Sequence, residues 1–564
     1  MKRKTLSILL CAAMAVSMLA GCGGSSDSQS SSQGSDETQT QESGAADTIV
    51  YSMDTAPSGV FNPLISDTAY DEAVNSAVYA SLLTVNPDSE LEEYLCESYE
   101  VSDDQLVITY HLRDNAKWHD GEDVTADDVV FTFTSMADGS YTGGNYGDVE
   151  KIKGAKAYHD GQADSVEGLK AVDEKTVEVT FEEIYAPAVT NLGVMGIIPK
   201  HIWEGADIAE WDNQTDLLNA PVGCGPYKLT EFKNGEYVSF EAAEDFFLGA
   251  PKTAKLMYKV VNPDTIQAEF KNGEINIANV SDLQSADIEA MEGEGLKLVS
   301  YPNFMFQYMG INLREEIFQD VNVRQAFMYA IDRKAMVEQL LEGRGEIVNA
   351  PMLPMLWSYP DESELEQYDY NPDKATDLLA AAGWTDSDGD GIVENEAGEK
   401  FSVVIDCPTG SAKREQAAVI IQESLKQVGV DVEINSMEFS ALMEKVVSNH
   451  DFDLYMMGNT LDLDPDPKPY WHSDAISNEP GVQGYNIVGY NNPETDALIE
   501  QGLATLVEDE RAQVYHEFGK ILNNDIGQVY LYNQDIERMY SEGLEGYQPS
   551  TFNEFYNLHN WELK

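Results

Sequence analysis

The segment from Ser402 to Met457 constrains the fold more than any other part of this 564-residue chain. Apolar and β-branched runs at 402–407, 431–436 and 452–457 predict three strands, and the intervening stretches 413–428 and 440–448 have helical periodicity. Strands that alternate with helices favour a largely parallel sheet. The sequence therefore predicts an α/β fold.

The loop after the third of these strands is the candidate ligand-binding site. It reads Gly458-Asn459-Thr460-Leu461-Asp462-Leu463-Asp464-Pro465-Asp466-Pro467. The two prolines end the strand, which leaves free backbone groups beside a cluster of acids. Ligands of open α/β folds bind at such strand ends. The alternative is that the aspartates only cap the following turn.

The N-terminus has the pattern of a secretory signal. Three basic residues at 2–4 precede the apolar run Leu6–Leu19 and the tetrapeptide Leu19-Ala20-Gly21-Cys22. We expect residues 1–21 to be a lipoprotein signal peptide and Cys22 to carry lipid, with an ordinary cleaved signal as the alternative. Residues 22–48 are rich in Ser, Gly, Gln and acid, which predicts a flexible tether.

The charge balance limits the partners. Thirty-four basic residues against 100 acidic ones give a net charge of −66, which argues against nucleic acid and anionic membrane surfaces. We interpret the charge as a solvated acidic surface that keeps a secreted protein soluble, with the steering of cationic or zwitterionic solutes as the alternative. The chain after residue 48 is too long for one core, so two or three domains are expected.

No catalytic or cofactor motif is found in the sequence. His516-Glu517 begins like a zinc-peptidase motif, but Lys520 stands where the second histidine is required. Cys96, Cys224 and Cys407 have no metal-ligand spacing and allow at most one disulfide, so buried free thiols are expected. We therefore predict a non-enzyme without a cofactor; a surface hydrolase with paired carboxylates remains an alternative.

An acidic loop at 386–397 imitates a calcium loop. Asp386, Asp388, Asp390 and Glu394 take positions 1, 3, 5 and 9, and position 6 is a glycine. The twelfth position, which needs a bidentate acid, is Ala397. We interpret the loop as an acidic surface turn, with calcium as the weaker alternative.

Three further segments have well-defined local patterns. In 106–133 a strand at 106–112, a turn at Asp120-Gly121 and an N-cap at Thr125 precede a helix. Residues 221–242 combine a Gly/Pro-rich loop with a hairpin around Asn234-Gly235. Residues 320–341 predict a core helix whose Arg324 and Arg333 could pair with acids.

These three segments also carry a resemblance to a known family. The stretches LRDNAKWHDGEDVTADDVVFTF (112–133), PVGCGPY (221–227) and VRQAFMYAIDR (323–333) resemble the family-5 extracellular solute-binding proteins of peptide and nickel ABC importers. The resemblance implies a two-lobed periplasmic-binding-protein-like α/β fold, class II and cluster C type, with an extra inserted domain. The implied division is a discontinuous domain I of 49–69, 199–303 and 533–564, an inserted domain II of 70–198, and a domain III of 304–532. The lobes would close about crossings near Pro199, Tyr301 and Tyr532.

The resemblance also implies a function and a site. The chain would be a monomeric, lipid-anchored, extracytoplasmic component of an ABC importer that delivers peptides to membrane permease subunits. The backbone of Gly458, Asn459, Thr460 and Leu461 would pair with the peptide, and Asp462 would hold its amine. Asn459 stands where tryptophan is often found, and the shifted Asp-Pro pair makes Asp464 a second candidate anchor.

A second segment of the implied cleft lies near the start of the folded chain. Its residues are Ser58, Gly59, Val60 and Phe61. The ligand could instead be a nickel complex, haem or another small solute, and a non-transport sensor or adhesin is a further alternative.

Overall fold

The computed structural model describes residues 47–564 apart from 480 and 483, and these belong to one compact unit. The signal, Cys22 and most of the predicted tether lie outside the described residues. Within the described part, no helix combines the length and the apolar character needed to cross a bilayer.

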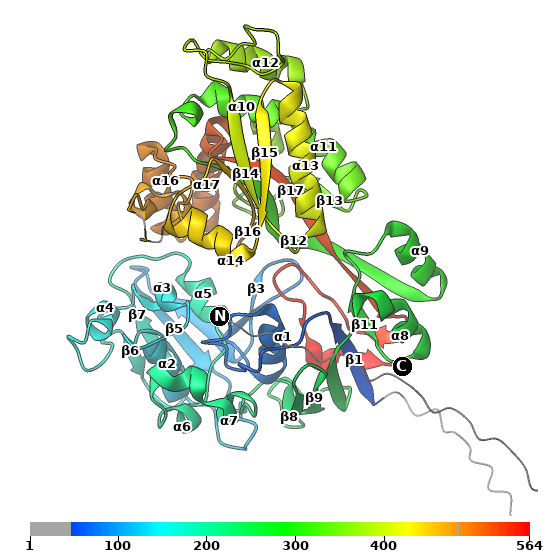
Figure 1. The fold of residues 1–564 in the computed structure, drawn as a ribbon. Coiled ribbons are helices and arrows are strands. Elements are labelled where there is room, and N and C mark those ends of the chain that lie inside the picture. The colour runs from blue at the N-terminus through cyan, green and yellow to red at the C-terminus, as the bar shows by residue number, and fades with distance from the viewer. Residues whose placement is uncertain (1–46, 480, 483) are drawn as a thin grey trace, which may run out of the picture. The chain divides into compact units, whose positions relative to one another are not determined.

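An 11-stranded mixed sheet runs through the molecule (Figure 1). Its strands follow the order β15-β14-β16-β12-β17-β11-β1-β10-β9-β8, and β13 pairs with β17 beside this path. Their bounds are β1 Thr48–Met53, β8 Tyr227–Lys233, β9 Tyr237–Ala242, β10 Lys255–Val260, β11 Ile277–Asn279, β12 Leu296–Ile311, β13 Gly345–Ile347, β14 Ser402–Pro408, β15 Asp431–Met437, β16 Leu454–Thr460 and β17 Gln528–Ser541.

The predicted α/β segment is confirmed. Strand β14 runs parallel to both β15 and β16, and helix α13 (Ala412–Gln427) connects β14 to β15. The sheet as a whole is mixed because β12 pairs antiparallel with β16 and β17. Two clusters of buried apolar side chains pack around this part of the sheet, and one of them contains Leu454 and Met456 of β16 while the other contains Tyr455. Alternate residues of β16 thus face different cores.

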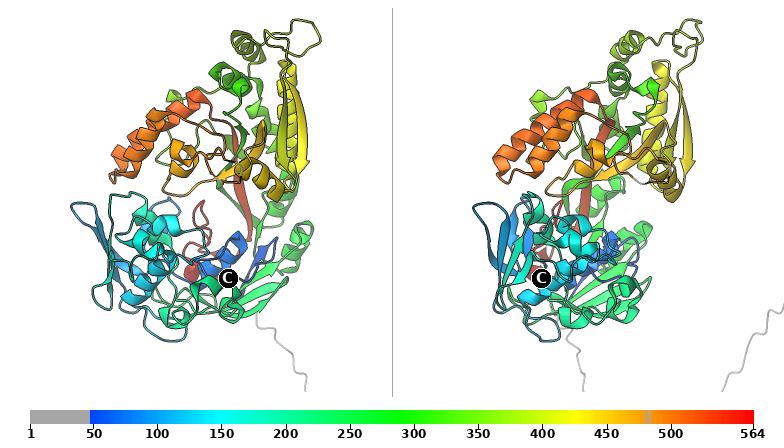
Figure 2. Two further views of the ribbon diagram at one scale, coloured as in Figure 1. Left: turned by 60° about the vertical axis from the view of Figure 1, so that its left-hand side comes forward. Right: turned by 90° about the vertical axis from the view of Figure 1, so that its left-hand side faces the viewer.

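Two long strands join the α/β part to the rest of the molecule. β12 and β17 pair from Leu296 opposite Ser541 to Gly310 opposite Gln528, with register shifts between Pro302 and Phe306 and between Gln307 and Tyr308. In Figure 2, β17 extends from the α/β part toward the part of the same sheet that contains β1. The expected domain boundaries at 303/304 and 532/533 lie inside these strands, and the domain limits stay a prediction.

The segment 106–133 forms the local structure that its pattern predicts. Strand β5 lies in an antiparallel sheet of order β4-β5-β7-β6, and Thr125 and Asp128 form a capping box at α2. Asp128 also accepts bonds from Trp118 Nε1 (3.4 Å) and the Lys200 amide (2.9 Å). The bounds are β4 Cys96–Val101, β5 Val107–Leu112, β6 Leu169–Ala171, β7 Thr176–Thr180 and α2 Ala126–Met136.

The Gly/Pro-rich loop at 221–227 packs on this segment. The His119 amide donates to the Gly223 carbonyl at 2.7 Å, and His119 Nε2 lies 3.0 Å from the Gly225 carbonyl. Burial lowers the pKa of His119 to about 4, so the ring is neutral at pH 7. The predicted hairpin follows as β8 and β9, and Cys96, Cys224 and Cys407 are buried free thiols as expected.

The predicted helix 320–341 is wrong in its continuity. α10 (Val321–Ala330) ends before Asp332, whose side chain caps a second helical stretch made of α11 (Arg333–Ala335) and a π-helical segment, Met336–Leu340. The expected pairing with acids is also wrong, because Arg324 donates to four backbone carbonyls and Arg333 to three, with the Asn349 side chain as its fourth acceptor. Both buried guanidinium groups thus donate mainly to backbone carbonyls.

The remaining elements frame the candidate site and the C-terminus. They include α1 Ala69–Val78, β2 Leu83–Val85, β3 Leu91–Glu93, α3 Tyr146–Val149, α5 Ala188–Val194, α8 Ile266–Asn272, α9 Ser285–Gly293, α12 Pro372–Ala381, α14 Phe439–Met443, α15 Lys468–Trp471, α16 Pro493–Leu503, α17 Glu508–Asp525, β18 Leu544–Glu545 and β19 Glu562–Leu563.

Candidate functional site

The end of β16 has one edge without a strand partner among the described residues. Met305 to Ile311 of β12 pair with Thr460 to Leu454 along one edge. On the other edge, β14 pairs only with Leu454 and Tyr455. Residues 456–460 therefore have backbone groups that no strand uses on that side. An extended ligand chain could add to this edge as a further strand.

The predicted residues Gly458 to Leu461 lie at this strand end. The Leu461 amide donates to the Phe304 carbonyl at 2.9 Å, which continues the ladder beyond Thr460. A side chain at Gly458 would meet the sulfur of Met305 first and then Gln307, with a Cβ 2.9 Å from Nε2. Gln307 Oε1 in turn accepts from Arg414 Nε at 3.0 Å. Glycine at 458 thus leaves room for this bonded pair.

The two candidate anchor aspartates have different surroundings. Asp464 Oδ1 lies 2.6 Å from Nη2 of Arg511, and both side chains are largely buried, with 13% and 4% exposed. The Arg511 guanidinium lies 5.2 Å from the ring centres of Trp357 and Tyr515, and these two rings stack on each other with their centres 5.9 Å apart. The carboxylate of Asp464 is thus neutralised by the protein itself. Asp462 makes no ion pair or side-chain hydrogen bond among the described residues.

Asp462 lies in an acidic environment. Its side chain reaches solvent, yet the surrounding protein partly desolvates the carboxylate, and the charges of Asp466 and Asp464 add to this; together they raise its pKa. Burial also raises the pKa of Asp466, against the opposing bonds from the Lys468 amide (2.9 Å) and the Tyr185 hydroxyl (3.3 Å). A cation near Asp462 would stabilise the charged form of both carboxylates and so lower the pKa of Asp462 and of Asp466.

A third carboxylate comes from a distant part of the sequence. Asp148 of α3 accepts from Asn191 Nδ2 at 2.7 Å. Its pKa is raised to about 6, mainly by burial and further by the charges of Asp462 and Asp466. The sequence offered no signal for Asp148, because it lies in a short helix after a glycine-rich turn. The tertiary structure thus brings three carboxylates into one electrostatic group.

The segment around α5 contacts the loop that follows β16, residues 461–467, directly. The Thr190 hydroxyl lies 3.4 Å from Asp464 Oδ2, and the Ala186 amide donates to the Leu503 carbonyl at 2.8 Å. With the Tyr185 bond to Asp466, these contacts connect the part of the chain that carries β4–β7 to the α/β part. The carboxylates of Asp148, Asp462 and Asp466 therefore lie where the part of the chain that carries β4–β7 meets the α/β part.

Two cavities adjoin the loop. A cavity of about 30 Å³, with room for a water molecule, is lined by Asn459 to Asp462 together with Tyr470 and Trp471. A much larger one, about 1050 Å³, is lined by Leu463, Asp464 and Arg511 and also by residues of the preceding part of the chain, among them Leu91, Tyr99, Gln105, Ala186 and Thr190. Its volume is at the upper end of the range for small-molecule pockets, roughly 300–1,000 Å³.

The predicted segment Ser58 to Phe61 packs beside α1. Ser58 Oγ and the Gly59 amide donate to Asp71 of α1, at 2.8 and 3.0 Å. Phe61 is fully buried and packs edge-on against Phe232. This segment is absent from the linings of the two cavities next to residues 458–467.

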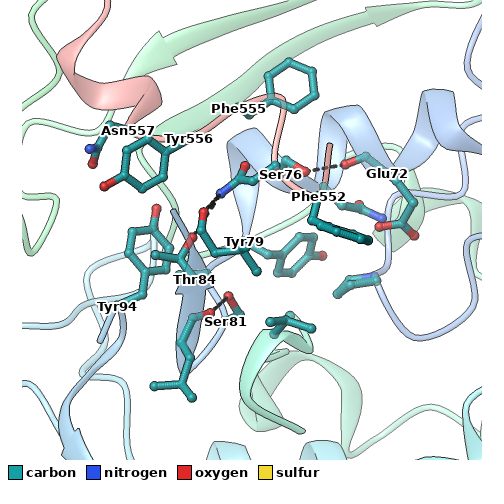
Figure 3. Close-up of a pocket in the computed structure, with 18 residues that line it drawn as sticks. Glu72, Ser76, Tyr79, Ser81, Thr84, Tyr94, Phe552, Phe555, Tyr556 and Asn557 are labelled. Carbon is teal, nitrogen blue, oxygen red and sulfur yellow. Dashed lines mark hydrogen bonds between the residues drawn. The ribbon is translucent and has the colours of Figure 1, made fainter. Parts of the chain in front are cut away.

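A third cavity, of about 190 Å³, lies beside α1. Figure 3 shows Glu72 and Ser76 of α1 near Tyr79, Thr84 and the C-terminal residues Phe552 to Asn557. Asn553 Nδ2 donates to Thr84 Oγ1 at 3.1 Å across this region. Because the cavity contains neither Asp462 nor Asp464, it is separate from the acidic group.

Comparison with known proteins gives consistent matches over nearly the whole chain. Residues 90–479 match the model of the bacterial extracellular solute-binding proteins, family 5. The oligopeptide-binding protein AppA of Bacillus subtilis is 32% identical over 100% of this chain and 99% of its own. The heme-binding protein A of Haemophilus influenzae is 29% identical over 97% of both chains.

Solved structures of related proteins also match this chain over most of its length. The structure of Bacillus subtilis AppA in complex with a nonapeptide superposes with a TM-score of 0.74 at 30% identity, covering 92% of this chain and 99% of that one. NikZ of Campylobacter jejuni, in complex with Ni(L-His), has a TM-score of 0.74 at 25% identity with the same coverage. The two-lobed α/β fold expected from the sequence is thereby confirmed.

Proposed function

Because the chain belongs to the bacterial extracellular solute-binding proteins of family 5, we propose that it captures peptides for an ABC importer and holds them by their amino terminus. The observation that carries the proposal is the combination at the end of β16. An unpaired strand edge leads directly into Asp462, a carboxylate without an ionic partner among the described residues.

The chemistry of a peptide matches this combination. A peptide carries a donor and an acceptor at nearly every residue, and burial leaves them unsatisfied unless a strand edge accepts them. Residues 456–460 offer such an edge. The ammonium group at the peptide's start needs a counter-charge at the end of that edge, and Asp462 stands there.

The three carboxylates of Asp148, Asp462 and Asp466 favour a ligand whose end is positively charged. Burial is the largest cause of the raised pKa of Asp148, Asp462 and Asp466, and the charge of Asp466 adds to it at Asp148 and Asp462. An ammonium group placed among them would lower each pKa and gain the corresponding interaction energy. An anionic or neutral ligand end would gain none of it.

Two known relatives are named for other ligands, and these ligands are the alternative to a peptide. Heme-binding protein A is a sequence relative and NikZ with Ni(L-His) has the same fold, so a haem or nickel complex is the competing ligand class. No histidine lines the two cavities beside residues 458–467. Because imidazole is a common ligand of nickel and of haem iron, this lining favours a peptide.

The finer features of the family role are part of the same proposal. We propose that a lipid on Cys22 tethers the protein at the outer face of the cell membrane. The loaded protein, as a monomer, would then deliver its ligand to membrane permease subunits. A lipidated N-terminal peptide found by mass spectrometry of the protein from its own membrane would support the tether.

One experiment tests the ligand class directly. Native mass spectrometry of the purified protein should reveal a ladder of short peptide masses, which denaturation releases. Calorimetry should then give binding to a free-amine peptide and at least tenfold weaker binding to its N-acetylated form, since about 1.4 kcal/mol corresponds to tenfold. Retained haem or nickel, or equal affinity for both peptides, would contradict the proposal.

A further inference from the structure

The acidic loop between α12 and β14 differs from the expected surface turn in one respect. Asp386, Asp388, Asp390 and Glu394 each offer one ligand atom, and these four atoms lie within 4.8 Å of one another. The three aspartates are exposed, but Glu394 is only 4% exposed. A buried glutamate therefore faces three exposed aspartates across a tight loop.

Glu394 carries the inference because one of its oxygens has no partner. Oε2 accepts two bonds from Ser387, from the amide at 2.9 Å and from the hydroxyl at 3.1 Å. Oε1 is buried and has no hydrogen-bond partner among the described residues. An unsatisfied buried carboxylate oxygen is costly, so its retention calls for a ligand.

The backbone fixes Glu394 in this position. Its amide and carbonyl both bond to Thr385 at 3.0 Å, which closes the loop as an antiparallel bridge. The next residue back, Val393, donates to the Gly429 carbonyl at 2.8 Å and has its side chain in the α/β core. The glutamate is thus anchored to the body of the protein and is not a mobile surface side chain.

The aspartates are ordered around the same space. Asp386 accepts from the amides of Gly389 (2.7 Å) and Gly391 (3.1 Å), and both glycines have positive φ. Lys400 forms an ion pair with Asp390 and is the one basic group that contacts the four acids among the described residues. Four carboxylates with one lysine leave an excess of negative charge in a small volume.

We propose that Asp386, Asp388, Asp390 and Glu394 bind one Ca²⁺ ion. Calcium takes six to eight oxygen ligands in flexible geometry, and carboxylates at the first, third and fifth loop positions are a known arrangement for it. The usual bidentate acid at the twelfth position is Ala397, and Glu394 at the ninth supplies the missing charge from the opposite strand. Burial of its free oxygen is what the sequence pattern did not reveal.

The role of this ion would be structural. The loop precedes the start of β14, whereas the candidate ligand site follows the other end of the parallel strand β16. Calcium would therefore bind away from Asp462 and fasten the hairpin 385–400 to the α/β part. Ion and peptide binding should be separable.

The test uses the full-length protein after removal of divalent ions with EDTA. Isothermal titration calorimetry with CaCl₂ should give one site with a Kd of roughly 10⁻⁵–10⁻³ M. The thermal unfolding midpoint should rise with added CaCl₂, because an ion that binds only the folded state stabilises it. Asp388→Asn and Glu394→Gln should each weaken calcium binding at least tenfold.

Two controls separate the site from general ion effects. Asp377→Asn, on the exposed face of α12, should bind calcium as the original protein does. MgCl₂ at equal concentration should give a smaller midpoint shift, since Mg²⁺ demands stricter octahedral geometry. Absence of a calcium response, an equal response to Mg²⁺, or full binding in both loop variants would overturn the assignment.

Discussion

Arg511 lies 2.6 Å from Asp464 and leaves Asp462, two residues earlier, without an ionic partner among the described residues. Both aspartates stand in the same loop and carry the same charge. One belongs to a buried ion pair, and the other is available for a ligand. Substitution of each residue should therefore affect a different property.

Asp462→Asn should weaken peptide binding and leave folding intact. The substitution removes the counter-charge for the ammonium group while it keeps the size of the side chain. Loss of one charged hydrogen bond costs about 1.5–3 kcal/mol, or roughly 10–100-fold in Kd. Titration calorimetry with a peptide that the protein binds would measure this, with Asp377→Asn as the matched control. Unchanged affinity would remove Asp462 from the site.

Asp464→Asn should act mainly on stability. It leaves Arg511 buried without its counter-charge, and breaking one side of a buried pair costs about 3–5 kcal/mol. Urea unfolding followed by tryptophan fluorescence should give a clearly lower midpoint. The double variant Asp464→Asn/Arg511→Met should recover part of the loss. A midpoint equal to that of the original protein would show that the pair contributes little.

Peptide affinity should depend on pH through Asp148. Its pKa in the unliganded protein is raised to about 6, so the carboxyl is mostly protonated at pH 5 and offers little charge to an ammonium group. For the same reason, this group disfavours the folded state as pH rises from about 4 to 6. An ammonium ligand reverses that penalty, so binding should strengthen over this range and release protons.

The measurement is calorimetry at pH 5.0 and 7.5 in buffers of different ionisation enthalpy. If Asp148 accounts for the whole effect, a pKa of about 6 implies roughly tenfold weaker binding at pH 5. Asp148→Asn should reduce this difference. A pH dependence that persists unchanged in the variant would assign the effect to other carboxyls.

Gly223→Ala should destabilise the protein without touching the ligand site. A Cβ at this position would overlap the backbone of Val78, with 2.6 Å to its carbonyl carbon. Backbone atoms of two packed segments must then move apart, which costs about 1–3 kcal/mol. Gly205→Ala, which meets no atom within 4 Å, is the control. Equal urea midpoints for the two variants would contradict this packing argument.

Local sequence patterns predicted much of the fold. The capping box at Thr125, the hairpin around Asn234-Gly235 and the parallel arrangement of β14, β15 and β16 are all present. Each depends on residues close together in the chain or on one repeating alternation, so short-range chemistry is sufficient. The long helix at 320–341 failed because a capping Asp332 starts a new helix there.

The sequence by itself determined where the candidate site lies, since a strand that ends in a proline-rich acidic loop is a local pattern. It could not separate Asp462 from Asp464, foresee Asp148, or show that Glu394 of the loop 386–397 is buried with one oxygen unpaired among the described residues. Those answers depend on Arg511, on α3 and on the bridge from Glu394 to Thr385. The physical reason is that burial and charge pairing are set by residues that only the folded chain brings together.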